Sequence, residues 1–126
     1  MSGPTDIVLD TNALIAFLGH HAAVERLVQD ADRVSISIIT AIEFLAFQGF
    51  GPTDQKLLDD FLDDAIVVEL ADVNSSLVAA CVQIRRQKLL KLPDAIVAAT
   101  ALSRQAVLVT RDATFTRVPN LHVESF

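Results

Sequence analysis

Cysteine is almost absent from this sequence, and long apolar runs are absent altogether. The single cysteine, Cys81, cannot form a disulfide within the chain, which excludes a disulfide-stapled fold. No apolar run approaches the roughly 18–20 residues that a membrane-spanning helix needs. The first residues, Met1 to Asp6, also lack the basic start and apolar stretch of a signal peptide. We therefore expect a cytoplasmic protein that does not enter a membrane.

Positive charge is also scarce. The chain carries 10 lysines and arginines against 16 aspartates and glutamates, a net charge of −6, which by itself argues against nucleic-acid binding. The distribution weakens this argument, because residues 1–84 hold 3 basic and 13 acidic residues whereas residues 85–126 hold 7 basic and 3 acidic ones. This asymmetry indicates either a solvated helix end or a surface that contacts a polyanion such as RNA. The cations concerned are Arg85, Arg86, Lys88 and Lys91.

Apolar side chains, by contrast, are abundant. They make up 52% of the 126 residues, which is above the usual range for a globular protein. A chain of this length can build one domain with a substantial core, and we expect a single domain over residues 1–126 without repeats or linkers. The apolar excess favours buried parallel strands and a buried subunit interface.

Short apolar runs alternate with amphipathic stretches along the chain. The runs predict strands at residues 6–9, 34–38, 66–68 and 107–109, to which residues 121–123 can add a short fifth. The stretches predict helices at residues 11–18, 21–31, 39–48, from Thr53 or Asp54 onward, from Val73 through Ile84, and at 93–103. Alternating strands and helices are typical of βαβ units. We predict an α/β fold, a three-layer α/β/α sandwich around a mostly parallel sheet of four to five strands.

Four acidic residues lie near the predicted carboxyl ends of the strands, where open parallel sheets bind their ligands. Asp10 ends the first strand, and Asp112 lies three residues past the fourth. Asp94 opens the helix before the fourth strand, and Glu43 lies about one helical turn beyond the second. Three of them also have purely structural explanations: a helix cap for Asp10, a helix-dipole contact for Asp94 and a turn for Asp112.

Glu43 is the acid that is hardest to explain structurally. It interrupts an apolar helix whose nearest side chains include Ile39 and Phe47. We expect its carboxylate to be partly buried and therefore to have a partner, because burying an unpaired charge costs several kcal/mol. The alternative is a surface glutamate on a thin polar stripe.

Clustered carboxylates repel one another, and a divalent cation relieves that repulsion. Oxygen-only ligands favour Mg²⁺ or Mn²⁺ over zinc, and Cys81 with the scattered His20, His21 and His122 does not make a zinc spacing. Such a site suits phosphodiester hydrolysis, in which a metal ion activates a water molecule and stabilises charge on the leaving oxygen.

Four segments together resemble a known family. They read VLDTNAL from residue 8, IITAIEF from residue 38, LPDAIVAATA from residue 92 and VLVTRD from residue 107. In order, spacing and total length the chain resembles the PIN-domain nucleases, and most closely the VapC-type toxins of toxin–antitoxin pairs. The resemblance implies a Mg²⁺-dependent endoribonuclease that leaves a 3′-hydroxyl and a 5′-phosphate. It also implies homodimers and a small VapB-type antitoxin that lies over the active-site groove.

The resemblance also assigns roles to single residues. The four acids would form the metal site, with Asp10 and Asp94 as its most dependable ligands, whereas the position of Asp112 varies most among such toxins. The residues that would shape the site through hydrogen bonds are Thr11 or Asn12, and Thr110. An apolar patch near Glu43 is either ordinary core or a groove for a partner helix; it comprises Phe44, Leu45, Phe47 and Phe50.

Three other functions fit parts of this pattern. A phosphotransfer receiver domain needs an acidic pair near the first strand and a lysine after the last, whereas this chain offers only Arg111 there. A haloacid-dehalogenase-type phosphatase needs two aspartates flanking one residue, whereas the chain has an asparagine at position 12. A non-catalytic PIN-like module that binds RNA or protein is disfavoured because all four acids are present.

Overall fold

A computed structural model of the protein describes residues 5–126, so most of the N-terminal segment discussed above lies outside it. Five strands form one sheet in the order β3-β2-β1-β4-β5, and every neighbouring pair is parallel. The sheet confirms the predicted α/β architecture. The strands are β1 (Asp6–Leu9), β2 (Arg33–Ser37), β3 (Ile66–Val68), β4 (Val107–Val109) and β5 (His122–Glu124).

The central strand β1 shows why the sheet needs cover on both faces. Ile7 and Leu9 pack into one hydrophobic cluster, and Val8 packs into the other. Successive side chains of a strand point to opposite faces, so an entirely apolar strand such as this one is stable only between two layers.

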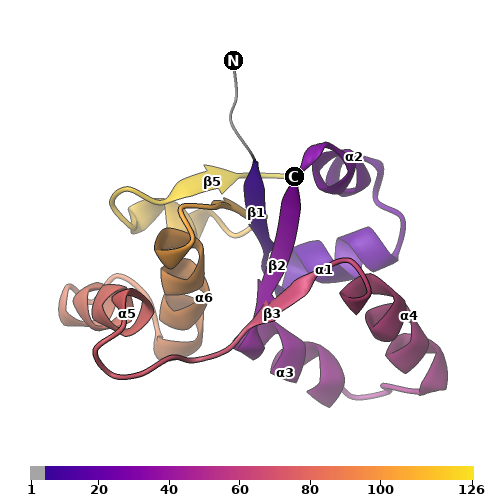
Figure 1. Ribbon diagram of the computed structural model, residues 1–126, viewed down its shortest axis with the longest axis horizontal. Helices are drawn as coiled ribbons and strands as arrows, with labels where there is room; N and C mark the ends of the chain where they lie inside the picture. Colours follow the sequence, from indigo (N-terminus) through magenta and orange to yellow (C-terminus); the bar gives the residue numbers. More distant parts are fainter. Residues whose placement is uncertain (1–4) are drawn as a thin grey trace.

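Helices supply these two layers (Figure 1). One face is covered by α5 and α6, together with the short 3₁₀ helix η1. The other is covered mainly by α1, α2 and α4, while α3 continues directly from the end of β2. None of the helices described between residues 5 and 126 has the length and apolar character needed to cross a membrane. The helices are α1 (Thr11–Leu18), α2 (Ala22–Asp30), α3 (Ile38–Ala46), α4 (Pro52–Leu62), α5 (Ser76–Arg86), α6 (Leu92–Ser103) and η1 (Ala113–Arg117).

The prediction for the start of α5 was wrong. Val73 was expected on the inner face of the helix, but it precedes the helix and its side chain is 78% exposed. The helix begins later because Ser75 caps it, with its Oγ accepting a hydrogen bond from the backbone N–H of Val78 at 3.1 Å. The remaining apolar positions, such as Leu77 and Ile84, face the core as predicted.

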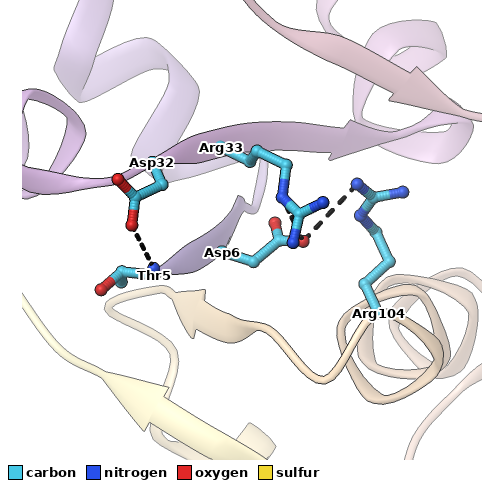
Figure 2. A network of polar contacts seen from close by, with 5 residues as sticks. All are labelled: Thr5, Asp6, Asp32, Arg33 and Arg104. Atoms are coloured by element: carbon cyan, nitrogen blue, oxygen red, sulfur yellow. Dashed lines mark hydrogen bonds and ion pairs between the residues drawn. The ribbon is translucent and has the colours of Figure 1, made fainter. Parts of the chain in front are cut away.

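An ion cluster around the buried Asp6 joins three elements at the amino edge of the sheet (Figure 2). The carboxylate of Asp6, at the start of β1, lies 3.7 Å from Nε of Arg33 on β2 and 3.5 Å from Nη2 of Arg104 after α6. Asp6 is only 8% exposed. A buried charge needs such partners, and here they tie the first strand to its neighbour and to the end of α6.

The strand order defines where a ligand should bind. From β1 the chain proceeds to β2 and β3 on one side, and then crosses to β4 and β5 on the other. The reversal makes the carboxyl ends of β1 and β4 the topological switch point, the usual binding crevice of open α/β sheets. Receiver domains have the order 2-1-3-4-5 instead, so the receiver alternative does not fit this topology.

Candidate active site

A cavity of about 290 Å³ opens at this switch point, and all four predicted acids line it. Each comes from a different part of the chain: Asp10 follows β1, Glu43 lies on α3, Asp94 lies in the first turn of α6, and Asp112 follows β4. The structure therefore brings together the four residues that the sequence singled out. The remaining lining residues are Thr11, Asn12, Val97 and Phe115.

Asp10 combines two roles that the sequence offered as alternatives. One carboxylate oxygen, Oδ1, caps α1 by accepting a hydrogen bond from the backbone N–H of Ala13 at 2.8 Å. The other, Oδ2, accepts one from the hydroxyl of Thr110. Asp10 is 6% exposed and is held rigidly at the wall of the cavity, so capping orients it for the site.

Two of the acids are held in a state that disfavours negative charge. Burial raises the pKa of Asp10, and the nearby carboxylates of Asp112 and Asp94 raise it further, against the hydrogen bonds from Thr110 and Ala13. Burial likewise raises the pKa of Asp94, and the charges of Asp112 and Glu43 add to this effect. The cluster is thus electrostatically strained without a compensating cation.

The prediction that the Glu43 carboxylate is partly buried was wrong. Its side chain is exposed at the cavity, because α3 begins at the carboxyl edge and projects beyond the sheet. The expected partner is nevertheless present, since the hydroxyl of Thr11 donates a hydrogen bond to Oε1 of Glu43. Helical periodicity indicated which residues surround Glu43, but not that α3 leaves the sheet at this point.

Asp112 is fixed by its own turn. Its Oδ1 accepts hydrogen bonds from the backbone N–H of Thr114 at 2.9 Å and from the Thr114 hydroxyl at 2.8 Å. These bonds lower the pKa of Asp112, and the charge of Arg117 contributes in the same direction. The backbone N–H of Asp112 donates to the Thr110 hydroxyl at 3.0 Å, so Thr110 connects Asp112 to Asp10.

Sequence reasoning missed three residues around this site. Thr114 orients Asp112, and an aspartate followed two residues later by threonine is a recognisable turn signal. Phe115 is 2% exposed and anchors η1 beneath the cavity. Arg117 lies near Asp112 only because η1 turns back, and no local pattern predicts that contact.

The predicted basic cluster divides into two groups. Arg85, Lys88 and Lys91 line a cavity of about 590 Å³ that shares Asp94 and Asp112 with the acidic one. Arg86 does not line this cavity but an apolar one along α5 and α6, which Arg85 lines as well. The histidines are exposed, as expected of surface or turn residues.

The donor set fits a hard divalent cation in charge and in chemistry, because the four acids offer only oxygen atoms. Within residues 5–126, however, no three side chains of histidine, cysteine, aspartate or glutamate converge closely enough to coordinate an ion as they stand. All four acids nevertheless line one cavity. Unneutralised carboxylates repel one another, which favours a spread arrangement of the four side chains. None of the side-chain hydrogen bonds described for residues 5–126 involves the carboxylate of Asp94.

Solved structures share this fold over nearly the whole chain. VapBC2 from Rickettsia felis, bound to a DNA fragment from its promoter, matches with a TM-score of 0.78 and 23% identity over 97% of this chain and 99% of that one. DNA-bound VapBC from Salmonella typhimurium matches with a TM-score of 0.78 and 24% identity, covering 96% and 98%. A toxin–antitoxin complex from Klebsiella pneumoniae matches with a TM-score of 0.73 and 24% identity, covering 91% and 94%.

Sequence comparison gives a family but no individual relative. No curated protein matches the chain significantly. The family model of the PIN domain matches residues 7–121, which span β1 through the segment before β5 and include all four acids. The chain belongs to the PIN domain family.

Proposed function

We propose that this chain is a divalent-metal-dependent endoribonuclease of the VapC toxin type, acting in the cytoplasm as a single domain over residues 1–126. The observation that carries the proposal is the single cavity at the switch point, lined by four carboxylates from four separate segments. Helix capping alone explains Asp10 and Asp112 but gives no reason for Asp94 and Glu43 to face them.

In this proposal Asp10 and Asp94 hold Mg²⁺ or Mn²⁺, and Glu43 and Asp112 complete the site. A divalent ion there activates water and stabilises charge on the leaving oxygen of a phosphodiester. Residues of the chain prepare the ligands: the hydroxyls of Thr110, Thr11 and Thr114 hold Asp10, Glu43 and Asp112 respectively. Asn12 adds a side-chain amide to the cavity wall.

RNA cleavage by the purified chain tests the proposal. We expect cleavage with Mg²⁺ or Mn²⁺, none with EDTA, and loss of cleavage in Asp10→Asn and Asp94→Asn while both variants remain folded by circular dichroism. Asp63→Asn is the matched control, because Asp63 is an exposed aspartate at the end of α4. Full activity of Asp94→Asn, or undiminished activity in EDTA, would contradict the proposal. Sequencing the cleaved ends also tests for the 3′-hydroxyl and 5′-phosphate.

A VapB-type antitoxin is the proposed inhibitor, since the structural neighbours are described as VapBC and toxin–antitoxin complexes. The candidate docking groove, of about 290 Å³, is lined by apolar side chains that include Ile15, Phe44 and Phe47. Phe44 is buried, whereas Phe47 is 41% exposed, so the predicted patch is partly core and partly surface. Co-expression with the product of an adjacent small open reading frame should yield a complex that Phe47→Asp weakens.

A homodimer is proposed on a second apolar surface. Leu70, Val82 and Leu92 are exposed and line a cavity of about 560 Å³ with residues of α5 and α6. Burying such a surface against a second copy is favourable, at roughly 25 cal/mol per Å². Light scattering after size-exclusion chromatography should give the mass of a dimer, and Val82→Glu should give that of a monomer.

One observation favours a second candidate function, a non-catalytic PIN module. The four acids do not converge to ligand geometry as they stand within residues 5–126. A protein of that kind would bind RNA or a partner equally well with and without Mg²⁺ and would leave RNA intact. The cleavage assay therefore distinguishes the two functions.

A further inference from the structure

The cavity of Arg85, Lys88 and Lys91 has a fourth cation that the sequence cluster does not contain. Arg117, at the end of η1, lines the same cavity from the opposite part of the chain. The chain has only 10 lysines and arginines in all, so this is a pronounced local concentration. The last turn of α5, the segment that joins it to α6, and η1 thus all contribute positive charge to one hollow.

Within residues 5–126 none of these four cations lies at ion-pair distance from an acidic side chain, although the charges of Lys91 and Arg117 act on Asp94 and Asp112 respectively. The ion pairs of residues 5–126 involve Asp6, Glu25 and Asp60 as the acids, and the four cations take part in none of them. Asp94 and Asp112 line the cavity, but they also line the acidic one next to it. The basic hollow is therefore left with an excess of positive charge directly beside the proposed metal site.

The turn that presents Lys88 is closed by two backbone hydrogen bonds. The backbone N–H of Leu89 donates to the carbonyl of Ile84 at 3.2 Å, and that of Lys88 donates to the carbonyl of Arg85 at 3.0 Å. This pattern closes α5 with a left-handed residue, a position that favours glycine. Here the left-handed residue is Lys88, with φ 56°.

A side-chain contact braces the same turn. Nη1 of Arg85 donates to the carbonyl of Leu90 at 3.0 Å, across the base of the turn. The chain thus keeps a lysine where backbone geometry favours glycine, just as His20, Gln105 and Asn120 occupy other positive-φ positions. The Arg85 contact fixes the turn that places Lys88 in the lining of the basic cavity.

We propose that Lys88, Lys91 and Arg117, with Arg85 bracing them, bind a phosphate of the RNA strand that flanks the phosphodiester positioned at the four acids. The proposal rests on the nuclease function and assigns this basic cavity to ground-state RNA binding, apart from the chemical step. Arg86 takes no part, because it does not line the basic cavity.

Binding of a short fluorescently labelled single-stranded RNA in EDTA, followed by anisotropy over a series of salt concentrations, tests the proposal. Each lost phosphate contact should flatten the slope of log affinity against log salt by about 0.7. We expect this change in Lys88→Gly and in Arg117→Ala. Arg86→Ala is the matched control, with an unchanged slope.

Lys88→Gly separates binding from folding, because glycine suits the left-handed backbone at this position. Its melting temperature should equal or exceed that of the wild type while its RNA affinity falls. With Mg²⁺ present, both Lys88→Gly and Arg117→Ala should raise KM, and Lys88→Gly should leave kcat nearly unchanged, as expected when uniform binding is lost.

An unchanged salt slope and KM in both variants would overturn the proposal, as would an equal effect of Arg86→Ala or no binding of the labelled RNA by the wild type. Cleavage with unaltered KM in the variants would reject this cavity and keep the nuclease function. The predicted binding changes without any metal-dependent cleavage would reject the nuclease function and keep the cavity as an RNA-binding site.

Discussion

At the scale of single residues, the site is organised by threonine hydroxyls as much as by carboxylates. Thr110 is fully buried, donates to Asp10 and accepts from the backbone of Asp112. The half-buried Thr11 and Thr114 likewise donate hydrogen bonds to Glu43 and Asp112 respectively. Partners that orient a ligand matter nearly as much as the ligand itself.

Thr110→Val should therefore impair the site by removing hydrogen bonds, with little change in the volume of the side chain. Valine has a similar shape but no hydroxyl, so Asp10 and the backbone of Asp112 each lose a bond. We expect the free energy of unfolding to fall by about 2 kcal/mol and the divalent-ion concentration for half-maximal cleavage to rise by roughly tenfold or more. Thr110→Ser should keep the free energy of unfolding and the divalent-ion dependence close to those of the wild type. A Thr110→Val protein with wild-type metal dependence would show that Thr110 does not position Asp10 or Asp112.

The acids also make a prediction about pH. Because the pKa values of Asp10 and Asp94 are raised from 3.8 in the folded chain, the folded state binds protons more tightly than the unfolded state. Stability in EDTA should then fall as the pH rises from about 4 through the raised pKa values. Asp94→Asn should lose part of this dependence and melt at a higher temperature than the wild type at neutral pH. Identical pH profiles of melting temperature for the two proteins would contradict the assignment.

At the scale of elements, the short helix η1 has a larger role than its length suggests. It follows Asp112, which caps it, and it ends at Arg117. Phe115 is its only buried residue. The element contributes to both cavities, because Phe115 lines the acidic one and Thr114 and Arg117 line the basic one.

Phe115→Ala should lower the free energy of unfolding by about 4 kcal/mol, the usual cost of removing a buried phenylalanine. Chemical denaturation measures this loss. Thr116→Ala, at an exposed position in the same helix, is the control and should change stability by less than about 0.5 kcal/mol. Equal stability of the two variants would mean that η1 does not depend on its anchor.

Most elements were predictable because their patterns are strong and local. Residues 6–9, 66–68 and 107–109 are strands as predicted, and residues 11–18 form α1 as predicted. The failures arose where tertiary context decides: η1 has no periodicity to detect, and the cap at Ser75 leaves Val73 in solvent. The exposure of Glu43 depends on where α3 leaves the sheet, which a helical pattern does not encode.

At the scale of the whole molecule, the two edges of the sheet have different roles. The carboxyl edge gathers acids around a cavity, whereas the amino edge holds the ion cluster of Asp6, Arg33 and Arg104 (Figure 2). The four acids could be placed at one edge from the sequence, because strand ends in a parallel sheet meet there. The strand order could not be predicted, nor could the contacts of Arg104 and Arg117 across the chain.

Arg104→Ala should separate the stabilising role of the amino edge from cleavage at the carboxyl edge. It leaves the buried Asp6 with only the exposed Arg33 as a partner, so we expect a loss of about 2 kcal/mol in stability. At a temperature where the variant is folded, its cleavage rate should equal that of the wild type. A large fall in rate without unfolding would show that the amino edge contributes to the site.

Calorimetry of Mn²⁺ binding is the sharpest test of whether the acids of four separate segments together hold divalent metal. We expect binding by the wild type, affinity at least roughly tenfold weaker for Asp10→Asn and Asp94→Asn, and wild-type affinity for Asp63→Asn. Wild-type affinity in Asp94→Asn, or no binding by the wild-type chain, would contradict a metal site at these four acids.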